Sequence, residues 1–454
     1  SRTRSMPSRT RPASTPPSWS VASLGDVMAI ESNLVAPNDY LDHPHVAPDN
    51  IESQTGVLLK YNTIRQDKVI SPKHLFLPGH IIYSKIRPYL AKAVIVDFTG
   101  LCSADMYPIR SFVETKYLHR WLISKDFTSL VTEHQGRTVL PKINQEALLP
   151  LPLPIPPHNE QRRIVAKLDT LLERCRRTGE LLADALALVS TYRRHVLTSA
   201  FSGALTAEWR KDIASSWSEV LLRELSSGFE YGTSSKSHPT GRVPVLRMGN
   251  LQAGKIVWED LAYTSDLAEI TKYQLLPKTV LFNRTNSPAL VGKTAIYDGE
   301  RPAIFAGYLI RINLLNAIMP EYINYYMNSQ RAKDYFWSVK TDGVSQSNVN
   351  AQKLGCLPVP ICSLPEQQEL VRRIEALFAK ADAIENQVQE AQAQLKMFEQ
   401  AILAKAFRGE LAPQDPNDEP ASVLLDRIRA GRAASSEKGT GKRSRSSKST
   451  EAAG

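Results

Sequence analysis

The feature that most constrains this 454-residue chain is an internal repeat. Residues 152–206 match residues 358–412 at a constant offset of 206, without a gap. The identical positions include two prolines, a Glu-Gln dipeptide and an Ala-Phe-x-Gly-x-Leu ending: Pro152, Pro154, Glu160, Gln161, Ala200, Phe201, Gly203 and Leu205 pair with Pro358, Pro360, Glu366, Gln367, Ala406, Phe407, Gly409 and Leu411. An ungapped match of this length indicates that one structural unit occurs twice.

The similarity continues upstream of these segments in a looser form. Trp19 pairs with Trp217, residues 77–88 parallel residues 276–287, and Tyr117 parallels Tyr322 at the start of a helical stretch. The offsets drift from 198 to 206, as expected when loops vary on a shared scaffold. We therefore expect an α/β fold in which two globular modules alternate with two long helices.

Each predicted long helix follows a proline-rich strand exit, which favours an extended approach and a sharp start. Apolar residues recur at spacings of three and four over five heptads, which predicts a coiled-coil seam. The seam positions are Ile164, Leu168, Leu171, Cys175, Thr178, Leu182, Ala185, Val189, Tyr192 and Val196, and then Leu370, Ile374, Leu377, Ala381, Ile384, Val388, Ala391, Leu395, Phe398 and Ile402. Gly203 and Gly409 are placed as C-terminal stops.

The length of these helices suggests a spacer between two binding modules. About 40 residues at ~1.5 Å per residue form a rod of roughly 60 Å. Two such helices are expected to pack antiparallel, with one module at each end and a pseudo-two-fold axis. DNA-binding dimers contact half-sites at least one helical turn apart, roughly 34 Å. The alternative is a coiled-coil protein–protein scaffold without sequence-selective DNA binding.

The patterns divide the chain into six expected segments. These are a disordered basic N-terminus (1–17), a first module (18–156), a first helix (157–206), a second module (207–362), a second helix (363–412), and a linker with a short amphipathic helix and a basic disordered tail (413–454). Val423, Leu424 and Ile428 give segment 420–434 a small apolar face, which favours contact with the helical pair or with a partner.

The charge of the chain supports a polyanionic partner only weakly. The net charge is +10, but residues 1–17 contribute +4 and residues 435–454 contribute +3. The body of the chain therefore carries only about +3. Basic tails are also common as solvent-exposed segments of proteins with other functions.

Composition also bears on compartment and redox state. No run of eighteen apolar residues occurs, so no transmembrane helix is expected, and the N-terminus lacks the apolar core of a secretory signal, which favours a cytoplasmic location. The cysteines contain no CxxC pair and are expected to be buried and reduced. They are Cys102, Cys175, Cys356 and Cys362.

No motif in the sequence predicts catalysis by the chain itself. Residues 287–294 (SPALVGKT) end like a phosphate-binding loop, but Ser287 replaces the first glycine and no helix is predicted to follow. Residues 15–19 (TPPSW) resemble a methyltransferase motif only faintly, since no glycine-rich cofactor loop accompanies them. His43 and His45 lack further ligands at metal-binding spacing. We therefore expect no catalytic residue, no cofactor and no metal in this chain.

The Glu-Gln motifs and the endings AFSGALT (200–206) and AFRGELA (406–412) resemble those of specificity subunits of type I restriction–modification systems. The resemblance extends from Trp19 to about Arg432 and is most specific in the two helices. Four further segments look like parts of that family's target-recognition domains: residues 83–92, 100–110, 229–237 and 243–256.

The resemblance implies a non-catalytic subunit with two target-recognition domains. Each domain would contact one half of an asymmetric bipartite sequence in double-stranded DNA, and the helices would fix the spacer between the halves. The implied partners are two DNA methyltransferase subunits, which use S-adenosylmethionine to methylate adenine, and restriction subunits, which use ATP and Mg²⁺.

Polar and basic residues in glycine- or proline-marked loops are the candidates for DNA contact, because such side chains reach base edges and phosphates. In the first module they are Lys60, Tyr61, Arg65, Ser84, Lys85, Arg87, Tyr89, Lys92, Gln135 and Arg137. In the second module they are Tyr231, Thr233, Ser234, Ser235, Lys236, Arg247, Asn250, Asn283, Arg284, Asn286, Ser345, Gln346 and Ser347.

Each candidate has an ordinary structural alternative as a surface charge or a turn residue. Ser84 and Lys85 follow an apolar strand in the first module, and Asn283 and Arg284 do so in the second, which favours these four. Arg247 ends a strand and could instead lie in a buried ion pair.

Overall fold

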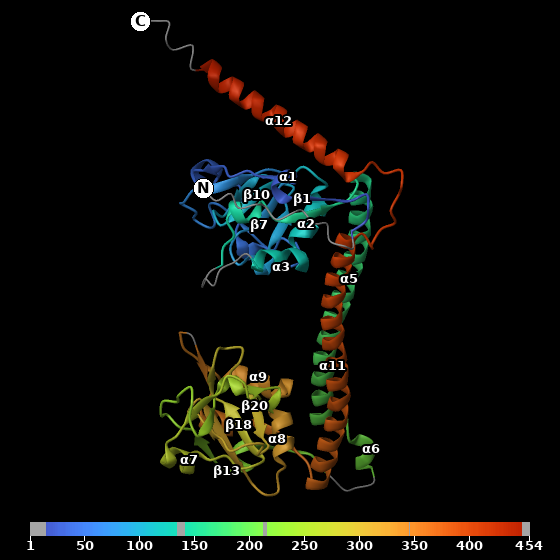
Figure 1. Cartoon of the computed structure of the whole chain (residues 1–454). Helices are drawn as coiled ribbons and strands as arrows, with labels where there is room; N and C mark the ends of the chain where they lie inside the picture. Colours follow the sequence, from blue (N-terminus) through green and yellow to red (C-terminus); the bar gives the residue numbers. More distant parts are fainter. Residues whose placement is uncertain (1–14, 134–140, 212–215, 345, 447–454) are drawn as a thin grey trace, which may run out of the picture. The chain divides into compact units, whose positions relative to one another are not determined.

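The computed structural model describes residues 15–133, 141–211, 216–344 and 346–446 (Figure 1). It divides into two compact units. Unit 1 consists of the chain up to Leu181 together with Ala391 onwards, and unit 2 consists of Leu182–Glu390. The divisions fall inside the two long helices, so each unit combines one module with part of both helices.

The long helices are α5 (His158–Phe201) and α11 (Leu364–Arg408). In unit 1 the N-terminal part of α5 shares a core with the C-terminal part of α11, where Leu168 and Ile402 belong to one cluster. In unit 2 the C-terminal part of α5 shares a core with the N-terminal part of α11. Within each unit the two helices are therefore antiparallel, as predicted.

The predicted seam is wrong at four positions. Thr178 and Tyr192 in α5, and Ile384 and Phe398 in α11, are exposed. These are equivalent pairs at the offset of 206, so both helices leave the seam at the same points. An α-helix with 3.6 residues per turn drifts by ~20° per heptad from a 3.5-residue repeat, which turns such positions outward.

Both long helices end at glycine, as predicted. Gly203 and Gly409 have the same φ of +78°, in the left-handed region that residues with a Cβ rarely adopt. The repeated glycines therefore adopt the same backbone geometry at the two helix ends.

The module of unit 1 contains two main sheets. The four-stranded sheet has the order β2 (Met28–Ile30), β10 (Met106–Ser111), β7 (Ile81–Ser84), β8 (Ala93–Ile95). The five-stranded sheet has the order β3 (Leu34–Val35), β6 (Lys73–Phe76), β9 (Gly100–Cys102), β4 (Pro44–Val46), β5 (Asn62–Thr63). The helices of this module are α1 (Leu24–Val27), α2 (Thr115–Leu122), α3 (Lys125–Glu133) and α4 (Gln145–Leu148).

The module of unit 2 has a larger central sheet. Its order is β13 (Ser226–Tyr231), β22 (Leu309–Leu314), β18 (Thr279–Asn283), β20 (Thr294–Tyr297), β16 (Gly254–Ile256), β15 (Leu251–Gln252). Two three-stranded sheets are formed by β17 (Ala262–Thr264), β14 (Val243–Leu246) and β21 (Ile304–Phe305), and by β19 (Thr285–Asn286), β24 (Ser347–Asn348) and β23 (Thr341–Asp342). The helices are α6 (Ala207–Arg210), α7 (Leu267–Tyr273), α8 (Pro320–Met327), α9 (Gln330–Val339) and α10 (Ala351–Gly355).

A short antiparallel strand pair joins the beginning and the end of each module. In unit 1 the pair is β1 (Ser20–Ser23) with β11 (Pro152–Ile155), and in unit 2 it is β12 (Ser218–Leu221) with β25 (Pro358–Ile361). The repeated prolines lie in these two-stranded sheets, where a missing N–H is tolerated. Each long helix therefore starts directly after a strand that closes its module.

The C-terminal helix α12 (Ala421–Ser446) packs on unit 1 and is longer than the predicted segment. Leu425 is buried in the core of unit 1, and Leu424 and Ile428 pack against it. Val423, which was predicted to share this face, is exposed. Among the described residues, no helix is long and apolar enough to cross a bilayer.

Candidate DNA interface

In unit 2 a small polar sheet brings two of the predicted loops together. Strand β19 continues the chain beyond β18 and pairs with β24, with Thr285 opposite Asn348 and Asn286 opposite Ser347. The Nδ2 atom of Asn348 also donates to Oγ1 of Thr285 at 2.7 Å. We call these strands (β19, β24 and β23) the polar sheet of unit 2. Arg284 and Asn286 therefore lie beside the loop around Gln346, although some 60 residues separate them.

Arg284 precedes the polar sheet and is held against an aromatic ring. Its guanidinium carbon lies 4.6 Å from the centre of the Tyr231 ring. Among the described residues its guanidinium makes one long hydrogen bond, from Nη1 to the carbonyl of Gly307 (3.5 Å), and its Nε is buried without a partner. The ring contact orients the guanidinium, and its Nη2 has no hydrogen-bond partner among the described residues, so it can donate to a ligand.

The loop that follows Tyr231 is tied to the same place by backbone contacts. Gly307 N donates to Thr233 O (2.7 Å), and Arg284 N donates to Tyr308 O (3.0 Å). A Cβ at Gly232 would lie 2.2 Å from the Phe305 carbonyl oxygen, so this close approach requires glycine. The exposed candidates Ser234, Ser235 and Lys236 extend from this loop.

Unit 1 builds an equivalent arrangement after strand β7. Ile86 forms a bridge with Lys142, and the backbone N–H of Arg87 donates to the carbonyl of Pro141 (2.9 Å). The Nζ atom of Lys85 lies 5.3 Å from the centre of the Tyr107 ring. Arg87 is exposed and has a φ of +45°, an unusual conformation for a residue with a Cβ. The predicted residue Tyr89 is also exposed.

Five of the predicted contacts are buried. Ser84, Thr233, Asn250, Asn283 and Ser347 are each at most 5% exposed. The Asn250 side chain bonds to backbone groups of its own loop, whereas both amide atoms of Asn283 lack a partner among the described residues. The predicted parallel between Ser84 and Asn283 is present in the backbone, but both side chains point into the core. In this conformation these five side chains are not accessible to a ligand.

The remaining candidates of the first module lie elsewhere or are engaged. Lys60, Tyr61 and Arg65 flank β5, at the edge of the five-stranded sheet rather than beside Lys85. Arg65 pairs with Asp42 (3.0 Å), which holds the pKa of that carboxyl below its ordinary value. Lys92 donates from Nζ to the carbonyl of Pro48 (2.8 Å).

Arg247 is not in the buried ion pair that we considered for it. It is exposed and donates to the backbone carbonyl of Asp260. Three predicted candidates, Gln135, Arg137 and Ser345, lie outside the described residues.

Three residues that the sequence patterns did not single out lie beside these candidates in the fold. Thr285 and Asn348 are half-buried partners in the polar sheet, and Tyr308 is 48% exposed beside Gly307. Thr285 and Asn348 could have been found, because each is adjacent in sequence to a predicted candidate. Tyr308 lies in a strand-like stretch with no polar pattern.

The repeated Glu-Gln motif has a structural role in both units. Gln161 accepts from the N–H of Glu114 (3.0 Å), the N-cap residue of α2, and donates to the carbonyl of Pro156 (2.9 Å). Gln367 makes the same two contacts in unit 2, with Met319 (3.1 Å) and Cys362 (3.0 Å). The motif therefore ties the start of each long helix to a helix of its own module.

The glutamates of the motif accept from equivalent tryptophans. Trp19 donates to Glu160 and Trp217 donates to Glu366, both at 3.0 Å. In unit 2 the ion pair from Arg210 to Glu366 (2.9 Å) completes the site.

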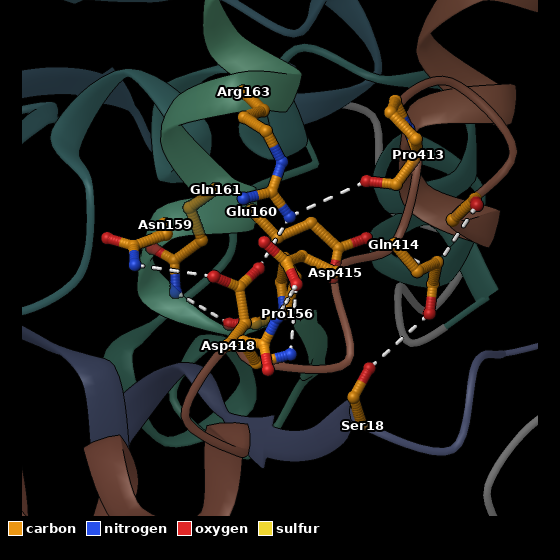
Figure 2. Close-up of polar contacts among 12 residues, drawn as sticks. Ser18, Pro156, Asn159, Glu160, Gln161, Arg163, Pro413, Gln414, Asp415 and Asp418 are labelled. Carbon is orange, nitrogen blue, oxygen red and sulfur yellow. Dashed lines mark hydrogen bonds and ion pairs between the residues drawn. The ribbon is translucent and has the colours of Figure 1, made fainter.

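In unit 1 the segment after α11 completes the corresponding site (Figure 2). Gln414 donates to Glu160 (3.1 Å), and Asp418 accepts from Arg163 (2.5 Å) and Asn159 (3.3 Å). Both motifs are fully occupied by internal contacts, so they build the frame and are not ligand sites.

The cysteines and carboxylates give no sign of a reactive centre. Cys102, Cys175 and Cys362 are buried and Cys356 is half-buried, and all four are free thiols. Burial raises the pKa of Cys102 to about 12, which keeps it a thiol rather than a nucleophilic thiolate. Within the described ranges, no group of three or more His, Cys, Asp or Glu residues could hold a metal ion.

Comparison with known proteins identifies the family of the chain. A family model described as the type I restriction modification DNA specificity domain matches residues 16–182 and again residues 217–392. These two regions cover most of the chain. The chain therefore belongs to this family and contains two copies of its specificity domain.

Individual relatives agree with this assignment. The chain is 45% identical over 199 residues to the EcoDI specificity subunit of Escherichia coli, covering 44% of this chain and 45% of the relative. It is 32% identical over 298 residues to the EcoKI specificity subunit of Escherichia coli strain K12, covering 62% and 64%. The matches thus span less than two thirds of either relative. A match to the StySPI specificity subunit of Salmonella potsdam is 28% identical and covers 89% and 92%.

The fold also matches a solved structure. A chain from a study of complex assembly and conformational transition of the type I R-M system superimposes with a TM-score of 0.68 at 22% identity, over 88% of this chain and all of that one. At this identity the match supports the fold alone.

Proposed function

We propose that this chain is the specificity subunit of a type I restriction–modification complex, in which each module contacts one half of a bipartite DNA sequence. One observation carries the proposal. In both units a central strand continues into a short, partly exposed segment that pairs with the chain following α3 or α9. The framework is the same, but the accessible side chains differ: Lys85 and Arg87 in unit 1, Arg284 and Asn286 in unit 2. One framework with different side chains suits two different half-sites.

Arg284 is the residue best prepared to contact a base. A guanidinium can donate two parallel hydrogen bonds to O6 and N7 of guanine in the major groove. Stacking on Tyr231 reduces the entropy that such a contact costs, because the plane is already oriented. Lysines and serines of the neighbouring loops suit phosphate contacts, which position the protein without carrying sequence information.

The test is binding of the chain, with its methyltransferase partners, to a bipartite duplex and to duplexes altered in either half. Arg284→Ala should weaken binding to the cognate duplex by about 1–3 kcal/mol if Arg284 contacts a guanine. Arg301→Ala is the matched control, because Arg301 also stacks on an aromatic ring, Trp258, at 4.5 Å. Equal affinity for all duplexes before substitution would instead favour a scaffold without sequence-selective binding.

We further propose that two methyltransferase subunits dock on the long helices, and that S-adenosylmethionine, ATP and Mg²⁺ are bound by partner subunits. Tyr192 in unit 2 and Phe398 in unit 1 support this stoichiometry. They occupy equivalent positions and are 41% and 55% exposed, although the heptad pattern predicted both to be buried. Equivalent exposed aromatic residues suit two copies of one partner.

Substitution of one aromatic residue should weaken one of the two docking sites. Tyr192→Ala or Phe398→Ala should shift the complex from two methyltransferase subunits towards one, as measured by mass photometry at limiting concentration. Leu181→Ala, also on an exposed position of α5, is a control for loss of apolar surface. Unchanged stoichiometry in both aromatic variants would rule out this surface.

A further inference from the structure

Three cationic side chains from separate segments gather next to the polar sheet of unit 2. Lys293 immediately precedes β20, Lys333 lies on α9, and Arg194 lies on α5. The backbone of Lys293 is fixed beside the end of β18, because its carbonyl accepts from Asn283 N at 2.8 Å. The next residue after Asn283 is Arg284, so the cluster adjoins the proposed base-contacting residue.

Packing places α9 beside the segment that carries Lys293, and α5 shares a buried cluster with α9. A Cβ at Gly292 would lie 2.9 Å from the ring of Phe336 on α9, so α9 lies directly against the segment that carries Lys293. Ala332 on α9 and Val196 on α5 belong to the same buried cluster. Lys333 and Arg194 lie one and two residues from these core positions, on the surface side.

The charges of the cluster are not compensated. The pKa of Lys333 is lowered, first because the surrounding protein displaces water and then because Arg194 and Lys293 repel its charge. In the part of the chain that the structure describes, none of the three forms an ion pair with a carboxylate. Arg194 donates to Thr191 Oγ1 (3.3 Å) and Lys293 donates to Gln252 Oε1 (2.7 Å), which are neutral acceptors. Like charges held together without a counter-charge cost free energy unless an anion binds.

Among its described residues, unit 1 has no equivalent cluster, although it has the same frame. The residue equivalent to Lys333 is Thr128, and the residue equivalent to Arg194 is Gln400. Lys92 corresponds to Lys293, since its carbonyl accepts from the N–H of Ser84 (2.9 Å) in the same way. Its ammonium is already bonded to the carbonyl of Pro48. The accumulation of charge is therefore specific to unit 2 and is not needed to build the fold.

We propose that Arg194, Lys293 and Lys333 bind phosphate groups of the DNA backbone beside the half-site contacted by unit 2. This inference rests on the proposed function and adds three residues that act without regard to base sequence. Ammonium and guanidinium groups are the usual donors to phosphate oxygens. Unit 2 would then hold the backbone with three cations, whereas unit 1 has one, Lys92, at the equivalent place.

The test compares a triple variant with a charge-matched control in the full complex with its methyltransferase partners. The variant carries Arg194→Gln, Lys333→Thr and Lys293→Gln; the first two introduce the residues that unit 1 has. The control carries Arg223→Gln, Arg301→Gln and Lys380→Gln, three exposed cations of unit 2 outside the cluster. Dissociation constants are measured for the cognate duplex and for a scrambled duplex at several salt concentrations.

The triple variant should lose affinity for both duplexes by a similar factor, with their ratio unchanged. The slope of log K against log salt should become less steep by up to about 2.7, since each phosphate contact contributes ~0.9. The single variants should each give about a third of this change, and the control should keep the wild-type slope. Melting curves establish that each variant is folded.

Three results would overturn the inference. They are a wild-type slope in the triple variant, an equal change of slope in the control, or a loss confined to the cognate duplex, which would indicate base contacts. If the wild-type complex has no preference for any duplex, the proposed function itself fails, which is a different outcome.

Discussion

Glu160 and Glu366 occupy equivalent buried positions, but the groups around them differ in charge. Glu366 is paired with the guanidinium of Arg210, whereas the two donors to Glu160 are the neutral side chains of Trp19 and Gln414. Burial accordingly raises the pKa of Glu160 above its ordinary value of 4.5. The carboxylate of the motif thus forms an ion pair in one unit, whereas in the other it accepts hydrogen bonds from neutral side chains.

Replacing each glutamate by glutamine should therefore have unequal effects. Glu366→Gln should destabilise the chain by about 1–3 kcal/mol, because it leaves Arg210 without its carboxylate. Glu160→Gln should cost less than about 1 kcal/mol at neutral pH, because an amide oxygen can still accept from Trp19. Urea unfolding of both variants checks this, and equal losses would contradict the difference in partners.

The raised pKa of Glu160 also predicts a pH dependence. A carboxyl whose pKa is higher in the folded than in the unfolded chain stabilises the fold below the unfolded value, and this contribution is lost as the pH rises through the folded value. The wild-type chain should therefore lose melting temperature relative to Glu160→Gln between about pH 4.5 and neutrality. A difference that stays constant over this range would show that Glu160 does not titrate as inferred.

The predictions for single residues failed where the direction of a side chain at a strand end could not be known from the sequence. Asn283 and Ser84 were chosen because they end equivalent strands, and the equivalence is correct in the backbone. Successive side chains of a strand point to opposite faces, and two neighbouring residues at a strand end do not reveal which one faces the core. Arg284 and Lys85, one position further on, are the accessible members.

At the scale of elements, α12 extends the core of unit 1 by a few apolar side chains. Leu425→Ala should cost about 2–4 kcal/mol, as is usual for deletion of a buried leucine side chain. Val423→Ala, on the same helix but exposed, should cost less than about 0.5 kcal/mol. Thermal unfolding of the two variants measures the contrast. Similar small losses would mean that α12 does not pack as described.

The sequence predicted where the long helices lie and how they pair, but not which of their side chains are exposed. Their limits, their antiparallel pairing within each unit and their terminal glycines follow from local patterns that the sequence displays twice. The exposure of Tyr192 and Phe398 does not follow from those patterns, because it depends on how far each helix drifts from the heptad repeat.

At the scale of the whole molecule, the repeat indicated two equivalent units, but their segments differ: unit 1 combines both ends of the chain, whereas unit 2 is the continuous stretch Leu182–Glu390. Unit 1 needs residues from both ends of the chain, as Gln414 and Asp418 illustrate. The cluster of Arg194, Lys293 and Lys333 could not be predicted, because its members come from three segments whose proximity only the fold defines. The net charge did not indicate the cluster either, since positive and negative charges are nearly equal in number in the body of the chain.

In the proposed function, the two modules contact different halves of one DNA sequence. Long-read mapping of methylated adenines in cells that express this chain with its methyltransferase partner tests it most directly. We expect a single motif with two specified halves separated by an unspecified spacer of fixed length, and Arg284→Ala should relax one half only. A continuous motif, a variable spacer, or equal relaxation of both halves by Arg284→Ala would contradict it.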